Sequence, residues 1–335
     1  MTVRNAAVQR VAQLWMVLTL LSAACNAEVK GKVLRYAELN TRQIEALDRA
    51  KTAIIIPGAP LEQHGPYLPS WSDGYWAERG SQDLATAIAS RPGWTAVLLP
   101  PIPLSCQGAE VIGFQYSTAG SLTPRCDTIR QVFMDLGDSL ATQRFKWIFI
   151  VNYHGGPLNN HALDLASDYF HDTYGGEMVH LFGILEMHFC CDLREKFLTP
   201  AQMKADGFTV HADAEETSMI LALAPKTVAR DFKSAPDQTA NNPAELLTVA
   251  GKPGWPGYFG SPRAASVALG LAEYRAGIQA ARNMAFKILD GFDYRSLPRY
   301  YDTMAKNESV SRVLAADHDA KQEARQNAWL KQRGF

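Results

Sequence analysis

The chain has 335 residues, of which 47% are hydrophobic and 20% charged, and its formal net charge is -1. This is ordinary globular composition, and the length suits one large α/β domain or two small ones. The near-neutral balance excludes both a basic nucleic-acid footprint and an acidic, solvating tail. We therefore expect the partner to be a small molecule or another copy of the chain, with no nucleic acid.

The N-terminus has the pattern of an export signal. Two arginines precede an apolar run at 11–21, and small residues follow it up to Ala27. A basic start, a short apolar middle and a small-residue exit predict a secretory signal peptide over 1–27, and hence a periplasmic or secreted protein. Cleavage before Cys25 would leave a lipid-anchored cysteine, the one membrane attachment that we expect, whereas cleavage after Ala27 would leave a soluble chain. A buried N-terminal helix is the alternative.

Four cysteines remain after this signal, and their spacing fits no zinc-binding pattern. Cys106 and Cys126 flank one loop region and can pair. Cys190 and Cys191 are adjacent, so a bridge between them would be strained. An exported protein permits disulfides, and the residues leave open whether these cysteines are bridged or free.

Strand and helix patterns alternate along the chain. Apolar runs predict strands at 51–56, 94–99, 146–151 and 178–185. Helical patterns occur at 41–50, 75–89, 126–141, 161–174, 215–224 and 261–289. This alternation predicts an α/β fold with a mostly parallel central sheet covered on both faces. We expect one catalytic domain over 28–292, with a surface excursion at 225–258, and a C-terminal extension over 293–335 that carries an exposed helix.

A first group of metal-binding side chains follows the strand predicted at 51–56. Glu62 and His64 are two residues apart, so an extended segment directs both to one face. Gly65 and a proline then turn the chain, and Asp73 can return to the same point. Two carboxylates and an imidazole suit zinc, manganese or iron, although such a loop also arises where polar residues only satisfy backbone groups.

Two further groups stand at a strand end and at a helix start. His154, Gly155 and Gly156 follow the strand predicted at 146–151, and the glycines allow a ligand close to the backbone. His211 precedes an acidic helix start that contains Glu216. Acidic residues there also complement the helix dipole, which is the structural alternative.

In this order the three groups resemble the creatininase family of amidohydrolases. The matching motifs are Glu-Gln-His-Gly with a downstream Asp, a strand-terminal His-Gly-Gly, and a His-Ala…Glu-Thr-Ser helix start. The Gly…Gly-x-Pro…Ala-Ser segment before the last helix, at 257–266, is similar too. The resemblance extends from about 39 to 289. It implies a three-layer α/β/α domain with two divalent metal ions (Zn, Mn or Fe), often assembled as a hexamer.

Carried over residue by residue, the resemblance implies that Glu62 and His154 bind one metal, His64 binds the other, and Asp73 bridges them. Creatininases proper place a second-metal Glu two residues after the strand-end histidine, where this chain has Gly156. Glu216 is the implied replacement.

The His-Gly-Gly branch of the family also continues with Asn, whereas this chain has Pro157. Asn159 is a potential substitute, or the contact is absent.

The resemblance implies hydrolysis of a C–N bond in a small cyclic amide, formamide or related amide by a metal-activated water. His211 would act as general acid to the leaving nitrogen. The N–H groups of Gly155 and Gly156 would stabilise the oxyanion, and Tyr153 and Trp71 would wall the substrate pocket.

Three interpretations of the function remain open. The first is an active C–N hydrolase. The family acts on creatinine, formamidopyrimidine and peptide substrates, and the missing Glu argues against creatinine itself. A catalytically inactive periplasmic metal-binding or scaffold protein of the same fold is the second, although a pure binder needs no His211. The third is a mononuclear metalloenzyme, expected if Glu216 points away from the site.

Overall fold

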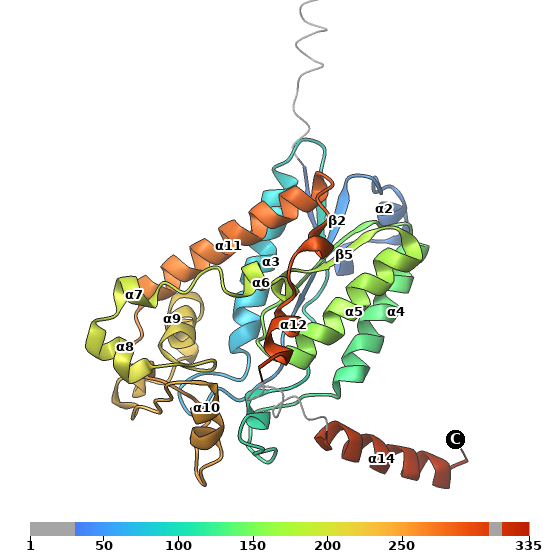
Figure 1. Cartoon of the computed structure of the whole chain (residues 1–335). Coiled ribbons are helices and arrows are strands. Elements are labelled where there is room, and N and C mark those ends of the chain that lie inside the picture. Colours follow the sequence, from blue (N-terminus) through green and yellow to red (C-terminus); the bar gives the residue numbers. More distant parts are fainter. Residues whose placement is uncertain (1–30, 308–316, 335) are drawn as a thin grey trace, which may run out of the picture.

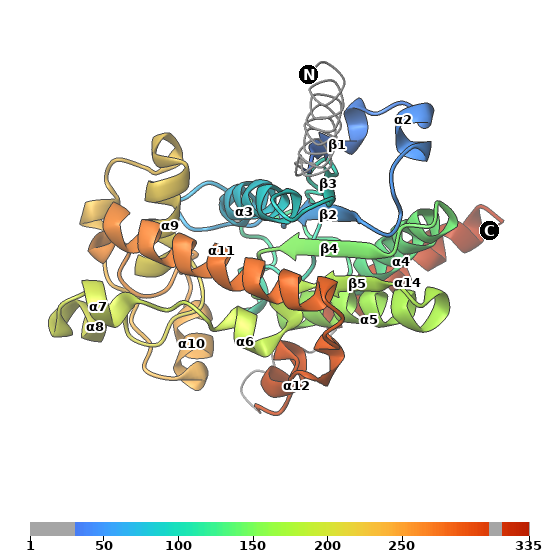
Figure 2. The ribbon, with the colours of Figure 1, turned by 90° about the horizontal axis from the view of Figure 1, so that it is seen from above.

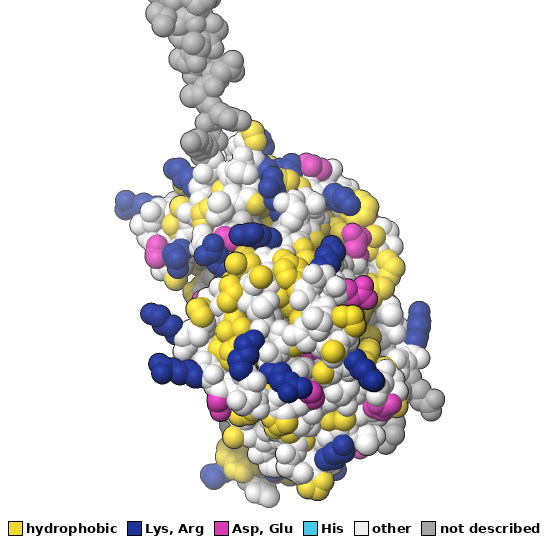
Figure 3. Space-filling model, turned by 90° about the vertical axis from the view of Figure 1, so that its left-hand side faces the viewer, with side chains coloured by type: hydrophobic (Ala, Val, Ile, Leu, Met, Phe, Trp, Pro, Cys, Tyr) yellow, Lys and Arg dark blue, Asp and Glu magenta, His cyan; other side chains and the backbone are white. Residues whose placement is uncertain are grey.

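The computed structural model describes residues 31–307 and 317–334. The predicted signal peptide, with Cys25, lies outside these described residues. Within them, no helix is both long enough and apolar enough to cross a membrane. Acidic, basic and apolar side chains are interspersed on the face drawn in Figure 3, in keeping with the near-neutral net charge.

The centre of the protein is a sheet of five parallel strands in the order β1-β3-β2-β4-β5. The strands are β1 (Val33–Arg35), β2 (Thr52–Gly58), β3 (Thr95–Leu98), β4 (Trp147–Asn152) and β5 (Glu177–His180). The predicted α/β fold with a parallel sheet is therefore confirmed. The three-residue edge strand β1 was not predicted, because so short a run carries no periodicity.

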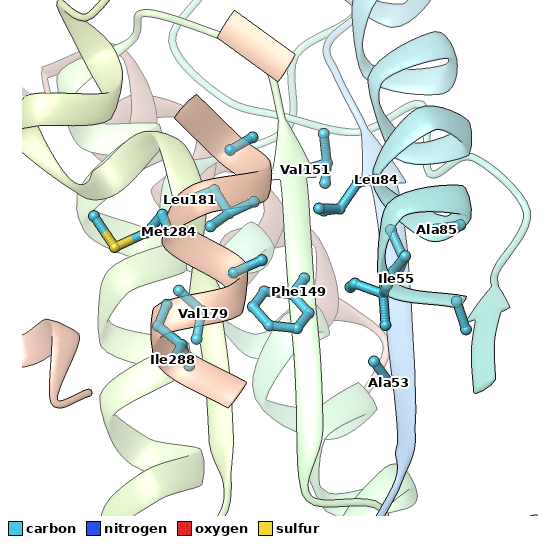
Figure 4. Close-up of a cluster of buried hydrophobic side chains, with 14 of the residues drawn as sticks. Ala53, Ile55, Leu84, Ala85, Phe149, Val151, Val179, Leu181, Met284 and Ile288 are labelled. Carbon is cyan, nitrogen blue, oxygen red and sulfur yellow. The ribbon is translucent and has the colours of Figure 1, made fainter. Parts of the chain in front are cut away.

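Helices cover both faces of the sheet, so the domain has three layers (Figures 1 and 2). One face carries α3 (Ser72–Ala89) and α11 (Val267–Leu289), and the other carries α4 (Cys126–Thr142) and α5 (Pro157–Tyr174). Alternate residues of each strand supply the two cores, since successive side chains point to opposite faces. Ile55 and Phe149 pack beneath α3 and α11 (Figure 4), whereas Ile54 and Ile150 pack beneath α4 and α5.

Two predicted elements are shorter than expected. The helix predicted at 41–50 ends early, as α2 (Thr41–Glu45), because the guanidinium of Arg49 turns back and donates to the carbonyls of Ile44 and Leu47. The strand predicted at 178–185 ends at His180 and continues as a 3-10 turn. Gly183 in that turn lies so close to the carboxylate of Asp164 that a Cβ there would clash with it.

The prediction for 225–258 as a surface excursion is wrong in part. This segment contains α10 (Pro243–Ala250), capped by the side chain of Asn242, and it buries Trp255 and Tyr258. The apolar residues of α10 recur at helical spacing, and that signal was available in the sequence. The last long helix starts at Val267 instead of 261, because Ser266 caps it through the N–H of Leu269.

The remaining described elements are short. They are η1 (Tyr36–Glu38), η2 (Ala109–Val111), η3 (Leu181–Gly183), α6 (Leu185–His188), α7 (Arg194–Phe197), α8 (Pro200–Asp206), α9 (Ala214–Leu223), η4 (Pro225–Thr227), η5 (Phe232–Ser234), η6 (Pro262–Ala264), η7 (Tyr294–Ser296), α12 (Tyr300–Ala305) and α14 (Asp317–Gln332).

The C-terminal extension differs along its length. Its first part packs on the domain, where Tyr294 and Tyr300 are buried and α12 contacts α5. The helix α14 lies at the rim (Figure 1) and has no buried residue.

All four cysteines of the described chain are bridged, as Cys106–Cys126 and Cys190–Cys191. The adjacent cysteines Cys190 and Cys191 are thus bridged, contrary to the expectation from strain.

Candidate metal centre

The site forms where two neighbouring parallel strands end. Strands β2 and β4 pair in register up to their last residues, so that Gly58 lies opposite Asn152. The chain segments that follow them, 59–71 and 153–156, therefore leave the same edge of the sheet side by side. Ligand sites in open α/β sheets form beyond the carboxyl ends of the strands in this way.

The segment after β2 folds back so that its two ends meet. The N–H of Glu62 donates to the carbonyl of Ser70 at 2.9 Å, and Gly65 makes the turn with a φ of 65°. A side chain at Gly65 would be strained, because positive φ disfavours residues with a Cβ. Asp73 then falls in the first turn of α3, where the helix dipole stabilises a carboxylate.

A first group of three ligands consists of Glu62, Asp73 and His154. The Nδ1 atom of His154 lies 3.1 Å from Oε2 of Glu62 and 3.2 Å from Oδ2 of Asp73. All three residues are buried. The other oxygen of Glu62 accepts the N–H of Ala109 at 2.6 Å, which fixes the orientation of that carboxylate.

A second group consists of His64, Asp73 and Glu216. The Nε2 atom of His64 lies 3.3 Å from Oδ1 of Asp73 and 3.6 Å from Oε2 of Glu216. Asp73 therefore directs one oxygen toward each group and joins them. Glu215 belongs to a different acidic group, with Asp192 and Glu273, so the two neighbouring glutamates of α9 point apart.

His211 lies beside both groups. Its ring centroid is 4.3 Å from that of His64, and its Nδ1 atom is 3.7 Å from Glu62 and 3.9 Å from Glu216. The backbone that follows is strained, since Ala212 has a φ of 51°. That conformation directs the N–H of Ala212 to the carboxylate of Glu216, at 2.5 Å.

Each of the three histidines has one ring nitrogen on a backbone carbonyl, which can only accept a hydrogen bond. His64 donates from Nδ1 to the carbonyl of Glu62 at 3.0 Å. His154 donates from Nε2 to the carbonyl of Cys106 at 3.0 Å, and His211 donates from Nε2 to that of Gln63 at 2.7 Å. The remaining nitrogen of each ring faces the carboxylates, where it can bind a metal ion once the ring is deprotonated. Metal-binding histidines are oriented by this kind of contact.

In the cluster, buried carboxylates face buried imidazoles, and each group shifts the pKa of its neighbours. Burial alone would lower the pKa of His64, but the adjacent carboxylate of Asp73, 3.3 Å from Nε2, and the charge of Glu216 raise it to about 10. Burial raises the pKa of Glu216 to about 8, to which the charge of Asp73 contributes. Glu216 is thus the last of these carboxylates to ionise, and a bound cation would favour its ionised form.

The side chains of this cluster are suited to binding a metal ion. The Nε2 atom of His64 is buried and has no hydrogen-bond partner, although it faces two carboxylates. A buried imidazole nitrogen without a partner is costly unless it binds something. Imidazole nitrogens together with carboxylate oxygens form a donor set suited to zinc and manganese.

The loop 153–156 shows why the position of Gly156 has no side chain. A Cβ there would lie 2.6 Å from Nε2 of His154 and 2.9 Å from the carbonyl oxygen of Gln107. A glutamate at position 156 would therefore require this loop to shift.

The expected substitute for the absent asparagine, Asn159, bonds elsewhere, to Asn152 and the N–H of Cys106. Asn160 holds the loop instead. Its side chain donates to the carbonyls of His154 and Gly156, both at 2.9 Å. The sequence interpretation missed Asn160, and the only available signal was the pair of adjacent asparagines at a helix start.

The two aromatic residues expected to wall the pocket lie in different surroundings. Tyr153 stacks on Trp76, with ring centroids 4.7 Å apart, and burial raises the pKa of its hydroxyl. Trp71 lies against Gly74 and donates its indole N–H to Glu78 at 2.7 Å. Trp71 is thus held against the first turns of α3.

Comparison with known proteins fits this geometry. The family profile described as creatininase, creatinine amidohydrolase, matches residues 37–284. A curated relative, the mycofactocin precursor peptide peptidase of Mycobacterium ulcerans (strain Agy99), is 31% identical over 136 residues. That match covers 39% of this chain and about half, 51%, of the relative.

Solved structures with the same fold include "Creatininase Mn", with a TM-score of 0.56 and 18% identity over 77% of this chain and 99% of that one. Another is a creatininase variant described as Zn-Zn type, with a TM-score of 0.55 and 18% identity over 76% and 98%. The chain belongs to the creatininase family.

Proposed function

We propose that this protein is a metal-dependent hydrolase that cleaves a C–N bond in a small cyclic amide, formamide or related amide. The observation that supports this most is the pair of buried ligand groups, Glu62–Asp73–His154 and His64–Asp73–Glu216, joined through the two oxygens of Asp73. We propose two divalent ions, zinc or manganese, with iron as the third candidate.

Divalent ions held by these residues would lower the pKa of a water molecule and polarise the amide carbonyl. His211 supplies the proton transfer. Burial, followed by the charge of His64, lowers its pKa to about 4, so the ring is neutral at pH 7. Its Nε2–H is held by Gln63, which leaves Nδ1 free to accept a proton from the water and deliver it to the leaving nitrogen.

The remaining roles belong to the loop after β4. The N–H groups of Gly155 and Gly156 are the proposed oxyanion donors. Tyr153 is the proposed aromatic wall, since it immediately precedes His154 and its ring is held by Trp76. Trp71 is the second proposed wall residue, and its indole N–H is held by Glu78.

Two substrate classes are candidates: a small cyclic amide or formamide, and a peptide amide. Gly156 stands where creatininases proper have a metal-binding Glu, which disfavours creatinine itself. The relative named as a peptide peptidase favours a peptide amide as the second candidate. Fold alone does not decide between them.

The test is metal analysis followed by hydrolysis assays. Purified protein is measured for metal content and then loaded with Zn²⁺ or Mn²⁺. It is incubated with creatinine, a formamide, a cyclic amide and short peptides, with and without EDTA. Turnover that EDTA abolishes and metal restores supports the proposal. Two bound metal equivalents without turnover of any amide would favour an inactive metal-binding scaffold.

We also propose that the protein is exported and forms a homo-oligomer, a hexamer as the family resemblance implies. The two disulfides support export, because such bonds persist in oxidising compartments. N-terminal sequencing of protein from the native envelope, together with light scattering, tests both points. An intact Met1 in a cytoplasmic fraction would refute export.

A further inference from the structure

The loop that contains His154 is held by a residue far along the chain. The hydroxyl of Tyr300 donates to the carbonyl of Gly155 at 3.1 Å. Tyr300 is buried and begins α12, in the segment that follows the last long helix. It also lies beyond residues 37–284, which the family profile matches.

Tyr300 completes a set of three consecutive bonds. On either side of the Gly155 carbonyl, the carbonyls of His154 and Gly156 accept hydrogen bonds from the side chain of Asn160. Asn160 lies in α5, the helix that follows the loop. The carbonyl between them, on Gly155, has its donor from the C-terminal extension. All three loop carbonyls are therefore held toward α5 and α12.

The direction of a carbonyl determines that of the next N–H. In a trans peptide unit the C=O of one residue and the N–H of the next point in opposite directions. The bond from Tyr300 to the carbonyl of Gly155 therefore also fixes the direction of the N–H of Gly156. That N–H is one of the two oxyanion donors proposed above.

Tyr300 is itself firmly positioned. Its ring stacks on that of His188, with the centroids 3.5 Å apart. The preceding residue, Arg299, donates to Asp164 at 3.2 Å and to Asp168 at 3.0 Å, both on α5. A phenol held between an aromatic stack and an ion-pair anchor keeps its hydroxyl directed at one point.

We infer that Tyr300 is a positioning residue, through which the C-terminal extension orients the Gly155–Gly156 peptide for catalysis. This inference rests on the proposed hydrolase function. Gly155 is exposed, so water can replace the lost donor when the hydroxyl is removed. The expected consequence is a loss of orientation in the loop and not a loss of the fold.

The test compares Tyr300→Phe with Tyr294→Phe in the full, zinc-loaded chain. Tyr294 is a matched control, since it is also buried in the extension and donates to a backbone carbonyl, that of Met178, at 2.7 Å. That bond leads to β5 and not to the loop. Both variants keep the aromatic ring and lose one bond between a hydroxyl and a carbonyl, so similar falls in Tm are expected.

Two readouts separate the variants. We expect the NMR order parameters of the Gly155 and Gly156 amides to fall from about 0.85 in wild type to about 0.6 or less in Tyr300→Phe, and to stay near the wild-type value in Tyr294→Phe. With an amide that the wild type hydrolyses, kcat of Tyr300→Phe should fall about 10- to 100-fold, with KM and zinc content unchanged. Unchanged order parameters in Tyr300→Phe, or equal changes in both variants, would overturn the inference.

The order-parameter readout needs no substrate. If the wild type hydrolyses no amide with any metal, the proposed function fails, whereas the order parameters still decide whether Tyr300 orders the loop. If the wild type is active, and Tyr300→Phe loosens the loop but keeps the wild-type kcat, the role of Tyr300 in catalysis is overturned while the hydrolase function stands.

Discussion

The Nε2 atom of His154 lies 3.0 Å from the carbonyl oxygen of Cys106, and Cys106 is disulfide-bonded to Cys126 at the start of α4. The bridge therefore anchors the backbone group that orients a proposed metal ligand. The carbonyl of the next residue, Gln107, lies equally close to the same ring nitrogen. Gln107 has a positive φ of 62°, a strained conformation that the surrounding structure must hold in place.

Removal of this disulfide should weaken metal binding as well as stability. In a variant with Cys106→Ser and Cys126→Ser, we expect the metal affinity of the Glu62–Asp73–His154 group to fall about 10- to 100-fold, because the ring loses a fixed acceptor. The free energy of unfolding should fall by about 3 kcal/mol, because the unfolded chain regains the entropy that this cross-link removes from it. Titration with a competing chelator measures the first effect, and urea unfolding the second.

The second disulfide provides the control for this prediction. Cys190 and Cys191 are neighbours in sequence, so their bridge closes almost no loop. Replacing both with serine should leave the metal affinity unchanged. Equal losses in the two double variants would contradict a specific role for the Cys106–Cys126 bridge.

Glu216→Gln should release one metal equivalent and most of the activity while the fold stays intact. Its carboxylate faces His64, and the group keeps only His64 and the shared Asp73 without it. Two protein ligands are too few for a tightly bound divalent ion. Elemental analysis of the purified variant gives the stoichiometry.

Glu215→Gln is the matched control, because Glu215 is the adjacent residue and lies with Asp192 and Glu273 instead. It should keep both equivalents. If both variants keep their full metal content and turnover, the second group is not a metal site.

His211→Asn should lower kcat by about 10²- to 10⁴-fold, the usual contribution of a general acid–base group. Its metal content should stay that of wild type, since each proposed site retains its three ligands without it. His211 also lies within ligand distance of Glu62 and His64. Loss of a metal equivalent in this variant would show that His211 binds a metal and does not serve as the proton carrier.

His188 should make the fold sensitive to acid. Burial lowers its pKa to about 3 from an ordinary value of 6.5, against the opposing effect of the Phe182 carbonyl. The folded state therefore holds it neutral, and the unfolded state takes up a proton as the pH falls through 6.5. Its contribution to stability is present above pH 6.5 and is lost progressively toward pH 3.

The variant His188→Phe, which can still stack on Tyr300, isolates this contribution. Urea unfolding at pH 7.5 and pH 5.5 should show a larger loss of unfolding free energy in wild type than in the variant, by about 1 kcal/mol. Identical pH dependence in the two proteins would show that His188 does not contribute.

Much of the fold was predictable from the sequence. The runs that became β2 and β4 are apolar over most of their length, and such runs predict buried parallel strands. The early end of the helix at 41–50 was not predictable, because Arg49 is also held by the carbonyl of Gln143, 94 positions along the chain, at 2.7 Å. Local patterns carry no information on such contacts.

The same distinction applies to the site. The residues that the sequence interpretation put forward as ligands, together with His211, lie together in the structure, since each stands in a motif at a strand end or helix start. The residues that orient them were missed. Asn160 acts through two hydrogen bonds to backbone carbonyls and Tyr300 through one, and Tyr300 lies 145 positions from its partner. Neither contact leaves a periodicity or a recognisable motif.

The two-metal centre joined through Asp73 can be tested with an anomalous difference map from a crystal of the zinc-loaded protein, recorded at the zinc absorption edge. We expect two peaks, one beside each oxygen of Asp73, with Glu62 and His154 around the first and His64 and Glu216 around the second. A single peak, or no peak among these residues, would contradict it.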